Sequence, residues 1–201
     1  MGAPYFTDAA RARIEGRAAH AGVEPEEGVS AIQIAAAAVA TMPLGRIDEC
    51  TTANVGRIEG GVAVNIVPAV VTPLWGSCRS LYEDRVLAQR DAMTRALEEA
   101  AARFGGQVEV AWELDYPAVV HEPGDAIAAH LEAAAATCGL ESRHATSGGG
   151  ADANILGTKG ADAITLGIGM TNFHSVDEYI EVVDLQNMAR YVEAIIAEYA
   201  M

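Results

Sequence analysis

Cysteine is scarce in this chain of 201 residues, and the only three cysteines are Cys50, Cys78 and Cys138. No two of them form a CxxC pair. This spacing excludes a zinc ribbon or a zinc finger, and the odd number argues against a disulfide framework. The composition therefore predicts reduced thiols in a cytoplasmic protein.

Positive charge is scarce as well, because 13 lysine and arginine residues stand against 28 aspartate and glutamate residues. The formal net charge of −15 argues against a nucleic-acid partner, since such proteins need a basic surface for the phosphates. Apolar residues make up 51% of the chain, which is enough to bury the core of one or two domains.

Long apolar runs are missing too. The alanine-rich stretch at 35–40 belongs to an expected helix between Gly28 and Pro43, and no run reaches the length of a membrane span. The first residues lack the charged and apolar segments of a signal peptide. We therefore expect no contact with a membrane.

Three familiar catalytic motifs are absent. No GxSxG nucleophile elbow occurs, and no GxGxxG motif follows a long strand. The glycine-rich segment at 147–150 lacks the lysine and serine that end a phosphate-binding P-loop. The sequence thus gives no support to a serine hydrolase of that type or to a nucleotide-binding protein.

The pattern of apolar residues over 9–116 predicts the order β-α-β-β-α-β. Alternating residues indicate strands, and apolar residues three and four apart indicate helices. This order is the ferredoxin-like arrangement of four antiparallel strands with two helices on one face. The expected elements are a strand at 9–19, a helix at 26–42 with Pro25 in its first turn, a strand at 51–59, valine-rich strand segments at 62–67 and 69–78, a helix opened by a capping box at Ser80–Glu83 and closed by Gly105, and a strand at 107–114.

The pattern changes after Pro117. The region 117–201 is α/β material, but it has too few strands for a doubly wound sheet, so it resembles a piece of a larger domain. The expected elements are a helix at 127–138, a short strand near 141–145, the start of a helix at 152–156, a fully buried parallel strand at 163–168, and a last helix at 184–199.

Two histidines and a glycine-rich loop are the candidates for function. His174 follows the expected buried strand and precedes a second capping box at Ser175–Glu178, where α/β proteins commonly bind ligands. The alternative is a surface histidine at the start of a helix. The three consecutive glycines at 148–150 either let the backbone approach a ligand or form a flexible loop. His20, between small neighbours, is either a catalytic or a loop histidine.

Several segments in this order together resemble one family, the di-zinc exopeptidases that include tripeptidase T, the glutamate carboxypeptidases and the aminoacylases. The tripeptidase T-like branch is the best match. The segments are Gly16–Gly22, Pro25–Ile32, Thr51–Gly56, Gly60–Gly61, Asn65–Pro68, Arg79–Ser80, Gly148–Asn154, and His174–Ser175 with Glu178.

The resemblance implies two domains and a distribution of roles. Residues 9–116 would be the lid or dimerisation domain, 117–201 the end of the catalytic domain, and 1–8 a linker from an earlier part. His174 would be a metal ligand, and His20 would stabilise the tetrahedral oxyanion in the active site of a partner subunit. The residues expected to hold substrate are Asn65, which acts across the dimer interface, Arg79, Gly149, Gly150 and Asn154.

The chain also departs from the family. The family's N-terminal segment carries a histidine two residues before an aspartate, a bridging aspartate, a glutamate pair and another aspartate ligand, and none of these is present. Hydrolysis of a peptide or N-acyl amide bond with two zinc ions is therefore expected of the complete enzyme. We expect this chain to be truncated, inactive alone and homodimeric. The alternative is a non-catalytic dimerisation module or a subunit of a split enzyme.

Overall fold

The computed structural model of the chain describes residues 2–3, 5–122 and 124–199, and it divides into two compact units. The first, called here the sheet unit, comprises Pro4–Ala118 and Gly148–Gly150. The second, called the helical unit, comprises Met1–Ala3, Val119–Ser147 and Ala151–Met201. Of the helices in the described residues, not one combines the length and the hydropathy that a membrane crossing requires.

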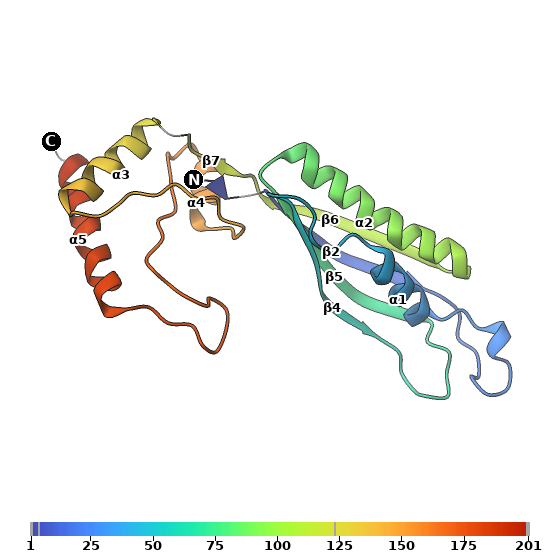
Figure 1. Cartoon of the computed structure of the whole chain (residues 1–201). Coiled ribbons are helices and arrows are strands. Elements are labelled where there is room, and N and C mark those ends of the chain that lie inside the picture. Colours follow the sequence, from blue (N-terminus) through green and yellow to red (C-terminus); the bar gives the residue numbers. More distant parts are fainter. Residues whose placement is uncertain (1, 4, 123, 200–201) are drawn as a thin grey trace. The chain divides into compact units, whose positions relative to one another are not determined.

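The sheet unit is a five-stranded antiparallel sheet with two helices, which confirms the predicted ferredoxin-like fold class (Figure 1). The strand order is β3-β4-β5-β2-β6, with a very short β3 at one edge. Its elements are β2 (Tyr5–Glu15), a 3-10 turn (Pro25–Glu27), α1 (Ala31–Thr41), β3 (Gly45–Arg46), β4 (Thr52–Gly60), β5 (Val70–Ser80), α2 (Glu83–Phe104) and β6 (Gln107–Tyr116).

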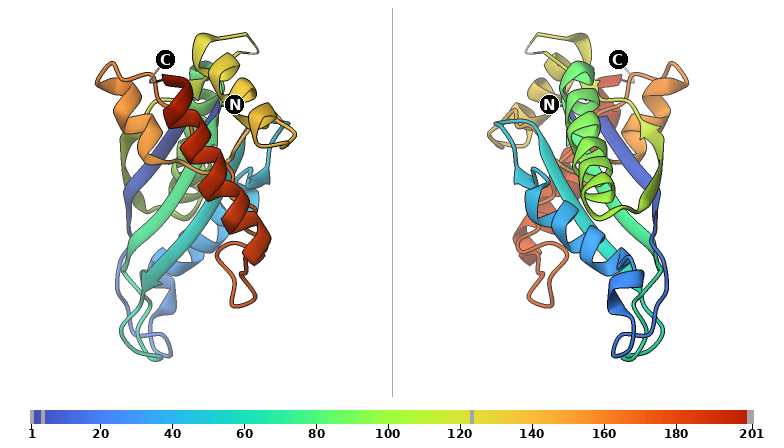
Figure 2. Two further views of the ribbon diagram at one scale, coloured as in Figure 1. Left: turned by 90° about the vertical axis from the view of Figure 1, so that its left-hand side faces the viewer. Right: turned by 90° about the vertical axis from the view of Figure 1, so that its right-hand side faces the viewer.

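Both helices cover the same face of this sheet, and the core lies between them and the strands (Figure 2). Alternation along β5 turns Leu74 and Cys78 inward, where both are buried. Met93 and Leu97 recur at helical spacing on α2 and meet them in one cluster. At about 25 cal/mol per Å² of apolar surface, burial of these side chains is the main stabilising term of the unit.

The first helix begins later than the sequence predicts. The expected start at residue 26 is wrong, because Pro25 opens a separate 3-10 turn and Gly28 is extended. Ser30 is the N-cap, and its Oγ accepts a hydrogen bond from the Gln33 amide at 3.2 Å. A serine oxygen at this position satisfies an amide that has no partner within the helix. The cap therefore decides the boundary, and the glutamates before it lie outside the helix.

Two predicted strands have different limits. β2 ends at Glu15 rather than at residue 19, and residues 62–67 are not a strand. They belong to the connection between β4 and β5, whose ladder closes at the pair Gly60 and Val71. The predicted linker at 1–8 contains β1 and the start of β2.

The capping box expected at Ser80 is wrong. Ser80 is the last residue of β5 and is fully buried, so its hydroxyl serves the strand end rather than a helix end. Tyr82 is the N-cap of α2 and makes no side-chain cap. The other end of α2 is as predicted, because Gly105 adopts a left-handed conformation with φ of 76° and ends the helix.

The helical unit contains a two-stranded ladder and three helices. Its elements are β1 (Gly2–Ala3) paired with β7 (Val119–Val120), α3 (Ala126–Thr137), α4 (Asp152–Thr158) and α5 (Val182–Tyr199). α3 and α5 pack side by side, and the Tyr191 hydroxyl donates to the Leu131 carbonyl at 2.9 Å. Across its described length α5 has no buried residue. A cavity of about 340 Å³ lies between α3, α5 and the segment 164–169.

Three predicted elements of this unit are wrong. Residues 141–145 and 163–168 form no strand, and no helix begins at Ser175. The apolar pattern at 163–168 is that of a buried strand, but a strand exists only where a neighbour supplies the other half of each hydrogen bond. No neighbouring strand lies beside it in the described part of the chain. The segment is therefore half-buried and unpaired.

Candidate active-site residues

His20 and Asn65 lie side by side at one end of the sheet unit. The segment after β2 and the segment before β5 are joined by the Ala21 amide, which donates to the Asn65 carbonyl at 3.0 Å, and by a bridge between His20 and Ile66. The ring nitrogen Nδ1 of His20 accepts from the Gly22 amide at 3.2 Å. His20 and Asn65 are both exposed. The structure thus brings together two residues that are 45 positions apart in the sequence.

Arg79 lies at the opposite end of the same sheet. It is the penultimate residue of β5 and pairs with Phe6 on one side and Thr52 on the other. Nine residue steps separate it from Val70, where β5 begins next to the His20 and Asn65 loops. At about 3.3 Å per residue, this is a separation of about 30 Å. No single small substrate can touch both ends of the sheet in one copy of the chain.

The glycine-rich loop meets the sheet unit at the Arg79 end. Arg79 Nη1 donates to the Gly148 carbonyl at 3.2 Å. Gly150 approaches Tyr116 so closely that a Cβ there would lie 1.5 Å from the tyrosine hydroxyl oxygen. Only glycine fits at this position, because any side chain would displace Tyr116 or the loop. The loop is therefore held on the strand ends rather than free.

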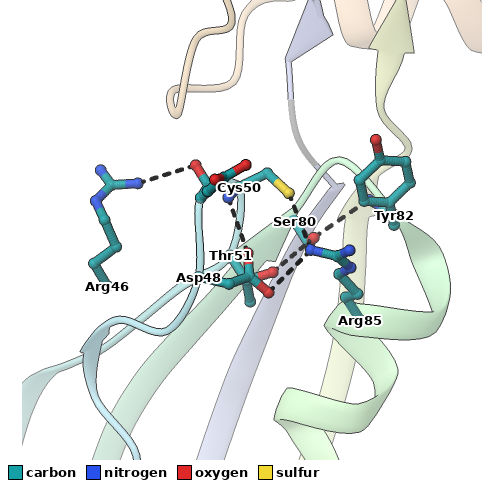
Figure 3. Close-up of polar contacts among 8 residues, drawn as sticks. Arg46, Asp48, Cys50, Thr51, Ser80, Tyr82 and Arg85 are labelled. Carbon is teal, nitrogen blue, oxygen red and sulfur yellow. Dashed lines mark hydrogen bonds and ion pairs between the residues drawn. The ribbon is translucent and has the colours of Figure 1, made fainter.

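A polar network fixes the corner next to Arg79, where β5 leads into α2 (Figure 3). The hydroxyls of Thr51 and Ser80 are 2.9 Å apart and both residues are buried. Ser80 Oγ also accepts from the Tyr82 amide at 3.3 Å. Two buried hydroxyls that bond each other hold the strand end in one conformation, since separating them would cost each hydroxyl a buried hydrogen bond. The sequence offered no sign of this pair.

The charges in this network lie on the loop before β4 and on the first turn of α2. Asp48 Oδ1 accepts from the Cys50 amide at 2.9 Å, and Asp48 Oδ2 lies 3.2 Å from Arg85 Nη1 (Figure 3). The hydrogen bond from the Cys50 amide lowers the pKa of Asp48 to about 2. The carboxylate in turn raises the pKa of Arg85, and burial raises the pKa of the Cys50 thiol. A raised thiol pKa makes Cys50 a poor nucleophile.

Asn154 is fully buried on the first turn of α4. Its Oδ1 accepts from the Ala151 amide at 2.9 Å. This contact ties the end of the glycine-rich loop to the helix, so the residue has a structural task. Its predicted part in substrate binding stays a prediction.

His174 sits in a tight loop of the helical unit. The loop is closed by a bridge between Thr171 and Tyr179, and His174 itself has φ of 64°, in the left-handed region that few non-glycine residues adopt. Its amide donates to Glu178 Oε2 at 2.8 Å. The glutamate thus holds the loop conformation and leaves the exposed imidazole facing solvent. His174 as a metal ligand stays a prediction.

The described residues do not form a metal site. Among residues 2–3, 5–122 and 124–199, no three histidine, cysteine, aspartate or glutamate side chains are grouped so that they could hold an ion. A zinc site needs three or four such ligands at about 2.0–2.3 Å, and His174 alone does not meet that requirement. We therefore assign no metal-dependent step to this chain.

Residues 8–104 match the family model described as the peptidase dimerisation domain. This segment is a peptidase dimerisation domain of the M20 family. It contains His20, Asn65 and Arg79, and it coincides with the sheet unit up to the end of α2.

The chain is similar to parts of several longer bacterial proteins. It is 46% identical over 190 residues to the protein YqjE of Bacillus subtilis, covering 94% of this chain and 51% of that protein. Over 74% of its length it is 28% identical to the succinyl-diaminopimelate desuccinylase of Marinobacter nauticus, of which it covers 38%. The chain thus spans about half the length of YqjE and 38% of the length of the desuccinylase.

Solved structures show the same fold. The aminopeptidase PepT of Bacillus cereus is 42% identical, with a TM-score of 0.85, and the match covers all of this chain and 53% of that one. A tripeptidase of Staphylococcus aureus is 38% identical, with a TM-score of 0.88, over 97% of this chain and 52% of that one. A more distant neighbour from Bacillus subtilis, 20% identical with a TM-score of 0.66, is a dinuclear metal-binding peptidase of the M20 family.

Proposed function

We propose that the chain is the C-terminal portion of a zinc-dependent exopeptidase, with the dimerisation domain at 9–116 and the end of the catalytic domain at 117–201. The observation that carries this proposal is the split of candidate site residues within a peptidase dimerisation domain. The start of β5, next to the loops of His20 and Asn65, lies about 30 Å from Arg79. A complete site therefore takes its histidine and asparagine from one copy and its arginine from another.

A homodimer through the sheet unit supplies this arrangement. The outer edge of β4 from Asn54 to Gly60 has no partner strand among the described residues, since β3 pairs only with Thr52 and Ala53. Such an edge is a ready template for a strand of another chain. The other edge, β6, carries Glu109 and Glu113, and pairing two copies there would place like charges together. The β4 edge is thus the favoured interface.

The substrate class follows from the residues at the Arg79 end. An arginine fork binds a carboxylate through two parallel hydrogen bonds, and the backbone of the glycine-rich loop lies against it. A short peptide or an N-acyl amino acid carries such a carboxylate. The similarity to an aminopeptidase at 42% identity and to a tripeptidase at 38% identity supports this class. We propose that the complete enzyme cleaves a peptide or N-acyl amide bond in such a molecule.

Zinc chemistry belongs, in this proposal, to the complete enzyme. Bound zinc would lower the pKa of a water molecule so that hydroxide is available at neutral pH. This chain contributes His174 and would bind zinc weakly at most, because one imidazole is not a site. Its own residues would orient the substrate through Arg79 and stabilise the oxyanion through His20 of a second copy.

The proposal predicts that the 201-residue chain alone hydrolyses no di- or tripeptide, even with added zinc or cobalt. Release of free amino acids would be followed for the chain and for the variants His174→Ala and His144→Ala. Hydrolysis that His174→Ala abolishes and His144→Ala leaves intact would contradict the proposed inactivity.

A second candidate is a non-catalytic dimerisation module, which the lack of a ligand cluster in the described residues favours. A chimera separates the two. The chain would replace the matching part of the aminopeptidase PepT of Bacillus cereus, of which it covers 53%. If the chain belongs to a peptidase, the chimera cleaves tripeptides and loses this activity with His174→Ala or His20→Ala. A folded, dimeric and inactive chimera supports the module.

A further inference from the structure

The loops that carry His20 and Asn65 also carry exposed apolar side chains. These loops, at 20–24 and 61–67, are called here the tip. Val62 is 86% exposed and Val64 is 102% exposed, and Val23 and Ile66 are exposed as well. Single exposed apolar residues are ordinary, but four of them on two hydrogen-bonded loops form a patch.

The tip is an ordered structure rather than a free loop. The Val67 amide donates to the Ala19 carbonyl at 2.9 Å, and the Glu24 amide donates to the His20 carbonyl at 3.1 Å. Gly28 lies so close to Val67 that a Cβ at residue 28 would be 2.8 Å from the valine side chain. Figure 1 shows both loops beyond the same end of the sheet. The chain thus keeps its valines exposed on a defined scaffold.

Charge limits what can cover this patch. Each copy of the chain has a formal net charge of −15, so two copies repel each other over most of their surfaces. The segment 61–67 contains no charged residue. It therefore offers an acidic chain a contact that costs no like-charge repulsion.

The apolar surface continues from the tip to the free sheet edge. Ile32 on α1 has its Cδ1 only 3.2 Å from where a Gly61 Cβ would lie, and both Ile32 and Ile58 are exposed. Ile58 is on β4, whose outer edge is unpaired among the described strands. The tip thus adjoins an exposed side chain of α1, and β4 carries a further exposed isoleucine at the proposed dimer edge.

We infer that Val62 and Val64 are buried against a second copy of this chain and so hold Asn65 and His20 at the site of that copy. This inference rests on the proposed function, which requires a homodimer, and adds the residues that seat the tip. A second copy is the occupant because residues 8–104 match a dimerisation domain, and the uncharged segment 61–67 supplies the contact.

The test is the dimer dissociation constant, measured by sedimentation over a dilution series. The double variant Val62→Ser/Val64→Ser is compared with the wild-type chain and with Val176→Ser/Val182→Ser. The control removes two valines that are exposed in the helical unit, Val176 being 101% exposed. We expect the tip variant to raise the constant at least about tenfold, because apolar surface that the dimer buries is lost. The control should leave it within about twofold.

Each remaining outcome has a defined meaning. A wild-type dimer whose constant does not change in the tip variant overturns this inference and leaves the homodimer standing. Equal weakening by the control overturns it too, because it shows unspecific association. A wild-type chain that is monomeric at high micromolar concentration overturns the homodimer and this inference together. Substitution at such exposed positions spares the fold, and the milder Val64→Thr should show a smaller weakening in the same direction.

Discussion

In the sheet unit, two helices lay their apolar faces on a sheet, and side chains such as Ile14, Leu74 and Met93 are buried. In the helical unit, α5 has no buried residue along its described length, and the strand-like segment 163–168 has no partner strand. The sequence is equally apolar in both regions, so composition does not explain the difference. The first unit contains every layer that its core needs, whereas the second leaves apolar side chains of α5 exposed along its described length.

The largest effect should come from the core of the sheet unit. Leu74→Ala removes a buried side chain and leaves a cavity, so we expect it to lower the free energy of unfolding by about 2–5 kcal/mol. Leu185→Ala on the exposed α5 should change it by less than about 0.5 kcal/mol. Tryptophan fluorescence in urea follows Leu74→Ala, because Trp75 and Trp112 both lie in the sheet unit, and circular dichroism follows Leu185→Ala. Equal losses for both variants would refute the difference in packing.

The second largest difference between the two units should be in their rates of amide hydrogen exchange. Amides in the central strands β2 and β5 exchange only when the sheet unit opens, whereas amides at 163–168 lack strand partners. We expect the strands to exchange at least about a hundredfold more slowly, as measured by mass spectrometry on peptides of the intact chain. Equal protection would show that the segment 163–168 has acquired a partner, for example in an oligomer.

The buried hydroxyl pair at the Arg79 end should have a smaller effect. Thr51→Val keeps the shape but leaves Ser80 without one of its partners, so we expect a loss of about 1 kcal/mol in the sheet unit. Thr158→Val in the helical unit removes an exposed hydroxyl and should cost less than about 0.5 kcal/mol. Urea unfolding followed by tryptophan fluorescence measures the first, and circular dichroism follows the second. No loss for Thr51→Val would mean that the pair does not hold the strand end.

The smallest effect is the acid dependence that Asp48 adds to the sheet unit. Its pKa is about 2 in the folded chain against an ordinary value of 3.8, so the folded state favours the charged form. This stabilisation is complete above pH 3.8 and is lost as the pH falls through about 2. The melting temperature of Asp48→Asn should therefore approach that of the wild type between pH 4 and pH 2. Glu98→Gln is the control, and a constant gap would contradict the linkage.

Much of the sheet unit could be predicted from the sequence, because its helices and strands find their packing and hydrogen-bonding partners within the same unit. Alternation in β6 and helical spacing in α2 mark elements whose partners are present in the chain. Ser80 was misassigned because a capping-box pattern does not show that the strand before it continues. Residues 163–168 have a strand pattern, but hydrogen bonding to a neighbour decides whether a strand forms.

The candidate site could be predicted only in part. The segments around positions 20, 65 and 79 resemble those of one family, but no spacing in the sequence shows that the first two lie on joined loops and the third at the other end of the sheet. That distance depends on strand register and length, which only the fold supplies. The hydroxyl pair of Thr51 and Ser80 is 29 residues apart and was missed for the same reason.

The central claim is that one copy of the chain holds Asn65 and Arg79 at opposite ends of β5, and that a second copy unites them. Spin labels at these two positions would be measured by pulsed dipolar spectroscopy. Doubly labelled chain diluted into unlabelled chain gives the distance within one copy, which we predict to be about 30 Å. Mixed singly labelled chains should give a shorter distance between copies. A distance below about 15 Å within one copy, or no interaction between copies, would contradict the account.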